Sequence, residues 1–163
     1  MFKEKFKKKV FNIHIQDPKV SLSNFDLVIA PEHDNLNGNN VITSKGAIHY
    51  LTSDEIKNNH DYLSDRLNKS KDSLLLILGG PNKYYDYEDQ SLLNIFSKIR
   101  KILDKNNLQA IVIPSMRTPE KTINLANEYF GKENLVINNV DKKAYLSALS
   151  LSKYIVVTCD STS

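Results

Sequence analysis

From residue 73 onward, short apolar runs of strand length alternate with segments that carry apolar residues at helical spacing. The apolar runs are residues 74–78, 110–113, 135–137 and 154–157, and the helical segments are 88–105, 118–131 and 142–151. Strands that are joined through helices pair in parallel, by right-handed crossovers that place helices on both faces of the sheet. We therefore predict an α/β fold built on a Rossmann-like parallel sheet, with each of these strands buried.

Two segments carry helix-start signals. Thr118 is predicted to cap a helix with Pro119 at its first position, where proline gives up no needed hydrogen bond. Residues 52–55 match a capping box and predict a single helix that buries Leu63 and Leu67. The polar residues 68–72 then mark a boundary before the regular part of the chain.

The first 50 residues also contain strand signals, but few helices. Residues 10–16 alternate apolar and polar side chains, residues 25–30 form a continuous apolar run, and residues 41–43 form a short third strand. The run at 25–30 is typical of a strand that is covered on both faces. Because few helices accompany these strands, and none follows the last strand of the chain, we expect the chain to be a fragment of a longer protein.

The positive charge of the chain is concentrated at its start. The formal net charge is +3, and the lysines between residues 3 and 9 account for all of it. A short basic tail is not a nucleic-acid-binding face, so nucleic acid is excluded as a partner. Phe2 and Phe6 would share one face of a helix; we interpret the tail as solvated, with peripheral contact to an anionic membrane as the alternative.

The sequence favours a cytoplasmic location. Cys159 is the only cysteine, so no internal disulfide can form, and no apolar run is long enough to cross a membrane. The lysine-rich start also lacks the apolar stretch of a signal peptide. The spacing of histidines and acidic residues matches no zinc signature, so we predict no metal and no bound cofactor.

Glycines and polar residues follow the first strand of the regular part. In open parallel sheets, ligands bind beyond the carboxyl ends of the strands. The loop there contains Gly79, Gly80, Pro81, Asn82 and Lys83, whose glycines would let backbone amides approach an anion while the lysine adds charge. The alternative is a tight turn without a ligand.

The loop after the second strand contains Ser115, Arg117 and Thr118. It opens a helix, where unpaired amides favour a phosphate, and a guanidinium can fork onto two phosphate oxygens. We interpret these residues as a phosphate site. The alternative is that Thr118 only caps the helix and Arg117 is solvated.

Two further groups of polar residues lie at strand ends. Thr158, Asp160 and Ser161 follow the last strand and are predicted to bind ribose or sugar hydroxyls, with capping of a following helix as the alternative. Glu32 and His33 follow the apolar run near the front of the chain. An acid beside an imidazole is a candidate pair for general acid and base catalysis.

Five short motifs occur in order along the chain. They are His14-Ile15-Gln16-Asp17-Pro18, residues 25–34, Gly79-Gly80-Pro81, Ser115-Met116-Arg117-Thr118-Pro119 and Val157-Thr158-Cys159-Asp160-Ser161. Together these motifs resemble the ELM-type mitochondrial fission protein family of plants and bacteria. The resemblance covers nearly the whole chain from His14 onward.

The resemblance implies a bacterial, divergent relative of the GT-B glycosyltransferases, with two Rossmann-like domains. Residues 1–50 would then be the incomplete end of the N-terminal domain, 51–72 a linker helix, and 73–163 the truncated start of the C-terminal, nucleotide-sugar-binding domain. The implied ligand is a nucleotide-sugar or another phosphorylated small molecule. Our first hypothesis for the reaction is glycosyl transfer, with Glu32 or His33 as the candidate base. The alternative is a non-catalytic scaffold that recruits partners, at a membrane through the lysine-rich tail.

Overall fold

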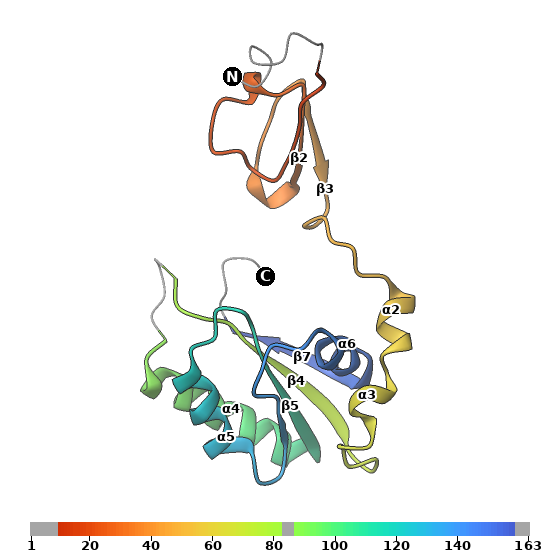
Figure 1. Ribbon diagram of the computed structural model, residues 1–163. Coiled ribbons are helices and arrows are strands. Elements are labelled where there is room, and N and C mark those ends of the chain that lie inside the picture. Colours follow the sequence, from red (N-terminus) through yellow and green to blue (C-terminus); the bar gives the residue numbers. More distant parts are fainter. Residues whose placement is uncertain (1–9, 83–86, 159–163) are drawn as a thin grey trace. The chain divides into compact units, whose positions relative to one another are not determined.

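The computed structural model describes residues 10–82 and 87–158 (Figure 1). The chain divides into two compact units, Met1–Tyr50 and Leu51–Ser163. Each unit contains its own parallel sheet, and helices flank the larger one. The predicted α/β class with Rossmann-like parallel strands is therefore confirmed. No helix within the described ranges combines the length and the apolar character that a membrane crossing requires.

The first unit contains the three strands predicted for it. They are β1 (Ile13–Ile15), β2 (Leu27–Pro31) and β3 (Val41–Ser44), with one-turn 3-10 helices η1 (Leu22–Asn24) and η2 (Glu32–Asp34) between them. All pairs are parallel, in the order β1-β2-β3. Each βα connection that a parallel sheet normally uses is reduced here to a loop with a single turn.

The sheet of the first unit is covered on one face only. Val28 and Ala30 of β2 are fully buried, whereas Ile13, Ile15 and Ile42 are each about half exposed. These three isoleucines share a face, because paired residues of neighbouring strands point to the same side of the sheet and side chains alternate along each strand. The prediction that the middle strand is covered on both faces is wrong, since within residues 10–50 no helix longer than one turn packs there.

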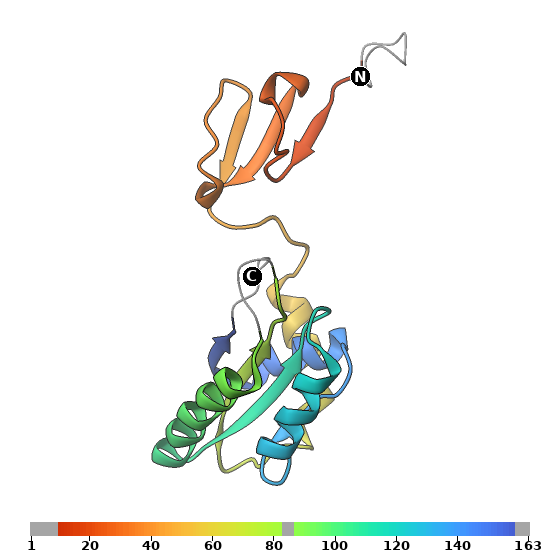
Figure 2. The same cartoon turned by 90° about the vertical axis from the view of Figure 1, so that its left-hand side faces the viewer.

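The second unit is a four-stranded parallel sheet between two layers of helices. Its strands are β4 (Asp72–Leu78), β5 (Leu108–Pro114), β6 (Leu135–Val136) and β7 (Ser152–Val157), in the order β6-β5-β4-β7. The crossovers contain α4 (Asp89–Asn106), α5 (Glu120–Phe130) and α6 (Lys142–Leu151). Helices α4 and α5 cover one face and α6 covers the other, as Figures 1 and 2 show.

Alternating residues of β4 divide the core into two clusters. Leu74, Leu76 and Leu78 pack against α4 and α5, where Phe96 and Phe130 are fully buried. Leu75 lies on the opposite face, in a second cluster with residues of α3 and α6. A strand that is apolar at every position can fill both layers, because successive side chains point to opposite faces.

Strand β7 differs from the prediction of a buried strand. Tyr154, Ile155 and Val157 are each about half exposed. Within the described ranges, β7 pairs with β4 alone and therefore lies at the edge of the sheet. An apolar strand sequence indicates a position in a sheet, but it does not show how many elements cover that position.

The segment predicted as one helix after the capping box forms two short helices, α2 (Ser53–Asn58) and α3 (Asp61–Ser64). The predicted cap is confirmed, because Thr52 Oγ1 accepts a hydrogen bond from Glu55 N at 3.1 Å. The helix breaks at residues 59–60 because α6 supplies the backbone partners there. Ser147 Oγ donates to His60 O at 2.9 Å and accepts from Leu63 N at 3.0 Å.

A carboxylate at the start of α6 strengthens the contact with the α2–α3 segment. Asp141 accepts a hydrogen bond from Tyr62 Oη at 2.7 Å and caps α6 by accepting from Lys143 N and Ala144 N at 2.8 and 3.2 Å. Each bond favours the ionised carboxylate. The Tyr62 bond, followed by the two backbone bonds, therefore holds the pKa of Asp141 below its usual value, against the opposing effect of burial.

This lowered pKa predicts an acid-sensitive contribution to stability. Because the pKa of Asp141 is lower in the folded chain than the usual value of about 3.9, its contribution is present above that value and is lost as the pH falls through the folded pKa. Urea denaturation at pH 6 and at about pH 3 should show a smaller acid-induced loss for Asp141→Asn than for the wild type. Equal losses would contradict this role.

Candidate functional site

The strand order of the second unit reverses at β4. Strands β4, β5 and β6 extend the sheet in one direction, and the chain then returns to place β7 on the other side of β4. In open parallel sheets, the carboxyl ends of the two strands at such a reversal border the ligand crevice. Gly79 and Thr158, the first residues after β4 and β7, lie at this point.

A threonine hydroxyl joins these two strand ends. Thr158 Oγ1 accepts a hydrogen bond from Gly79 N at 2.8 Å and lies 2.6 Å from Tyr87 Oη. Thr158 N also donates to Ile77 O at 3.0 Å, which continues the β4–β7 ladder by one residue. Thr158 is buried, so its hydroxyl faces other residues and not solvent, and it holds the ends of β4 and β7 together.

The loop after β5 approaches Gly80 so closely that only a residue without a side chain fits there. A Cβ atom built on Gly80 would lie 2.1 Å from Arg117 O and 2.5 Å from Arg117 C. Gly80 is buried, yet its amide donates no hydrogen bond to another residue of the described ranges. A backbone N–H of a buried residue that has no acceptor among the described residues is a candidate donor to a ligand.

A second threonine fixes the loop after β5 against the end of β4. Thr118 Oγ1 accepts from Ser115 N at 2.8 Å and is within hydrogen-bond distance of Leu78 O and Gly79 O, at 2.7 and 2.8 Å. Ser115 N also donates to Leu78 O at 2.9 Å. The two loops predicted as parts of one site are therefore joined directly.

The prediction that Thr118 caps α5 is wrong. The helix begins at Glu120, and Pro119 is its N-cap, because Pro119 O accepts from Thr122 N and Ile123 N at 2.9 and 3.2 Å. The Thr118 side chain makes no cap bond, since its hydroxyl is engaged with the carbonyls at the end of β4. Its role is to hold two loops together.

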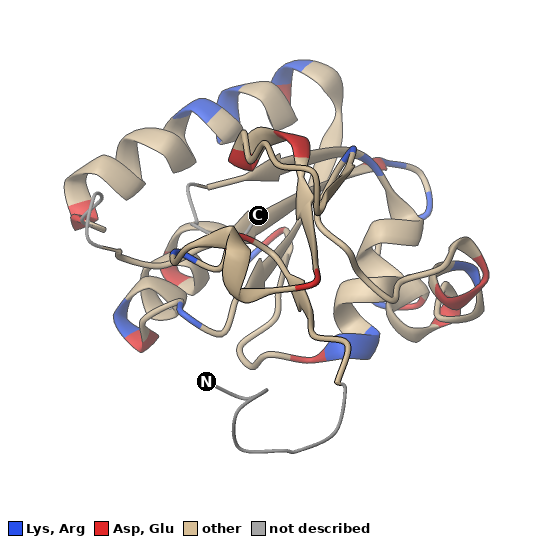
Figure 3. Cartoon of the chain, turned by 90° about the horizontal axis from the view of Figure 1, so that it is seen from above, with Lys and Arg blue, Asp and Glu red and all other residues tan. Residues whose placement is uncertain are grey.

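Arg117 is exposed on this loop, close to the start of α5. The other arginine of the regular part, Arg100, is engaged in packing: it donates to Tyr129 O at 2.7 Å and pairs with Glu133 at 2.9 Å. In the first loop, Pro81 is exposed and Asn82 is half-buried. Figure 3 shows basic and acidic residues interspersed along the helices.

The remaining predicted residues belong to the first unit or lie outside the described residues. Glu32 and His33 form part of η2 in the first unit, and both are exposed, with His33 Nε2 lying 3.8 Å from Asp34 Oδ1. Lys83, Asp160 and Ser161 lie outside the described residues, as does the lysine-rich tail. Their predicted roles stay predictions.

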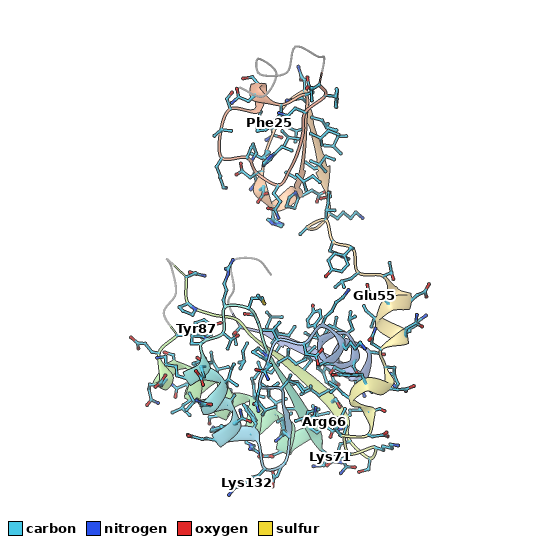
Figure 4. The ribbon with its side chains drawn as sticks, in the orientation of Figure 1. Phe25, Glu55, Arg66, Lys71, Tyr87 and Lys132 are labelled. Atoms are coloured by element: carbon cyan, nitrogen blue, oxygen red, sulfur yellow. The ribbon has the colours of Figure 1, made fainter. Side chains whose placement is uncertain are left out.

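Sequence reasoning missed a hollow between the starts of α4 and α5. It has a volume of about 310 Å³ and is lined by Pro81, Tyr87, Glu88, Pro119 and Lys121. Figure 4 shows Tyr87 in the loop that leads into α4, whereas Arg66 lies near the amino end of β4. No local sequence pattern marks the hollow, because its lining comes from two loops and two helix starts.

Comparison with known proteins adds one finding. The family model described as "Mitochondrial fission ELM1" matches residues 1–163, the whole chain. A search of curated proteins found no match.

Proposed function

The chain belongs to the mitochondrial fission ELM1 family, and we propose that it binds a phosphorylated small molecule of the nucleotide-sugar class beyond the carboxyl ends of β4 and β7. One observation carries the proposal: the buried Gly80 amide lacks an acceptor among the described residues, at the point where the strand order reverses. A phosphate oxygen is an acceptor that this position can use.

The surroundings of Gly80 favour an anion. The loop after β5 leads into the start of α5, where backbone amides point outward and the helix dipole is positive. Arg117 adds a guanidinium that can fork onto two phosphate oxygens. Thr158 and Thr118 act indirectly, because their hydroxyls hold the loops in position.

Glycosyl transfer is the finer level of this proposal. In it, the phosphates of the nucleotide are the leaving group, and amides and Arg117 stabilise the charge that develops on them. Glu32 or His33 of the first unit would accept the proton of the acceptor hydroxyl. Positioning of the two reactants would supply much of the rate of this reaction.

A non-catalytic scaffold is the second candidate function, and one observation favours it. The exposed isoleucine face of the first unit, formed by Ile13, Ile15 and Ile42, is the kind of apolar surface that protein partners cover. In this case the carboxyl edge of the larger sheet would keep its geometry without binding a nucleotide.

A thermal-shift panel of nucleoside diphosphates and their sugars separates these functions. A ligand at about 100 times its Kd should stabilise the protein by about 2.7 kcal/mol. We expect Arg117→Ala to abolish most of the shift and Arg66→Ala to retain it, because Arg66 is an exposed arginine of the same unit near the amino end of β4. No shift with any nucleotide, or equal shifts in both variants, would contradict the proposal.

A further inference from the structure

The outer face of helix α4 is basic. Its exposed lysines are Lys98, Lys101 and Lys105, and within residues 10–82 and 87–158 none of the three has an ion-pair partner. At 3.6 residues per turn they fall within about 60° of the helix surface. The two acids of the helix, Asp89 and Asp104, lie outside this arc. The face therefore carries three positive charges and no negative charge.

Two exposed isoleucines border these lysines. Ile95 and Ile102 are 37% and 46% exposed, whereas the core-facing stripe of α4 is fully apolar and buried. They stand about two turns apart, and on the helix surface both lie within about 60° of Lys98. The outer surface of α4 therefore consists of a basic strip with an apolar strip along one flank.

The stability of the helix does not account for this basic strip. A lysine in the last turn interacts favourably with the helix dipole, but that effect falls off within a single turn. It applies to Lys105, the basic residue of the last turn of α4, and not to Lys98 or Lys101. All basic residues of α4 lie in its second half (Figure 3). We therefore looked for a partner outside the second unit.

The size and charge of the face decide between classes of partner. A helix of 18 residues is about 27 Å long, and an outer face about 10 Å wide then covers roughly 270 Å². A specific protein interface buries about 800 Å² on each partner. A second copy of the chain would also place lysines against lysines. A lipid surface needs no complementary shape, and lysines clustered on an amphipathic helix attract anionic headgroups.

We propose that the outer face of α4 is a peripheral contact site for anionic membranes. Lys98, Lys101 and Lys105 bind the phosphate and carboxylate groups of the lipid headgroups, while Ile95 and Ile102 pack at the boundary with the acyl chains. This surface is separate from the lysine-rich start of the chain. It also uses no residue of the proposed phosphate site, so either site can fail without the other.

The test is sedimentation of the whole chain with vesicles of phosphatidylcholine, with and without phosphatidylserine. Only the anionic vesicles should bind the protein, and binding should be lost at about 1 M salt, where the Debye length is about 3 Å. Each lysine contributes about fivefold to partitioning, so the combined change Lys98→Gln, Lys101→Gln and Lys105→Gln should weaken binding about a hundredfold. Ile95→Gln with Ile102→Gln should weaken it about tenfold. Circular dichroism verifies that each variant keeps its helices.

The matched control is Lys7→Gln, Lys8→Gln and Lys9→Gln, which makes the same change in net charge at the start of the chain. This variant should keep most of the binding. The proposal is overturned if the control loses binding while the α4 lysine variant retains it. It is also overturned if anionic vesicles do not bind the protein; retention on immobilised polyglutamate that depends on the α4 lysines would then assign the face to an acidic protein.

Discussion

Gly80→Ala is expected to lower the free energy of unfolding of the second unit by about 3 kcal/mol, the upper part of the usual range for overpacking. The added Cβ would lie 2.1 Å from Arg117 O, and the neighbouring contacts at 2.5 and 2.7 Å are to Arg117 C and Cβ. None of these atoms is the far end of a flexible side chain. The loop after β5 would therefore have to move, and Thr118 ties that loop to the end of β4.

Urea denaturation followed by far-ultraviolet circular dichroism measures this loss, because every described α-helix belongs to the second unit. Gly46→Ala is the matched control, since nothing lies within 4 Å of a Cβ built on Gly46. The free energy of unfolding of Gly46→Ala should stay within about 0.5 kcal/mol of the wild-type value. If Gly80→Ala changed the free energy of unfolding as little as Gly46→Ala, the close approach of the two loops would be refuted.

Thr158→Val should cost about 2 to 4 kcal/mol, because it leaves the buried Gly79 amide without its acceptor and also removes the Thr158–Tyr87 hydrogen bond, while preserving the shape of the side chain. The Gly79 amide and the Tyr87 hydroxyl both lose the Thr158 oxygen. The substitution also frees the end of β7 from the Gly79 loop. We therefore expect nucleotide binding to weaken together with stability.

Tyr87→Phe provides the comparison for Thr158→Val, since it removes one of the two hydrogen bonds and leaves Gly79 bonded to Thr158. Its expected cost is about 1 kcal/mol. The same urea titration measures both variants. Equal costs would show that the Gly79–Thr158 bond contributes nothing, contrary to the role assigned to Thr158.

The helices of the second unit were predictable from periodicity. Leu92, Phe96, Ile99 and Leu103 recur at helical spacing, and all four are buried on one side of α4. A helix that packs on a sheet must bury one continuous stripe of apolar side chains, so its sequence carries apolar residues at helical spacing. The parallel strands followed from the same alternation of strands and helices.

Coverage of the strands was not predictable in the same way. Val28 is fully buried, whereas Ile155 is about half exposed, although both lie in continuous apolar runs. The difference arises from neighbouring elements, which local sequence does not specify. Such runs therefore predict strands better than they predict burial.

The candidate site was predictable to the level of its loops. Gly80, Ser115 and Thr158 converge because parallel strands end at one edge of a sheet, which strand order alone implies. The individual roles were not predictable: Thr118 joins two loops instead of capping α5, and Tyr87 reaches a residue 71 positions away in the sequence. These roles depend on distances that only the folded chain defines.

The Gly80 amide offers the most direct test of anion binding at this edge of the sheet. A titration with uridine diphosphate, followed through the amide proton of Gly80, should show a saturable downfield shift as a phosphate oxygen accepts its hydrogen bond. The shift should be much smaller at the same concentration in Arg117→Ala and unchanged in Arg66→Ala. A Gly80 resonance that stays in place while uridine diphosphate binds elsewhere, or does not bind at all, would contradict the proposed site.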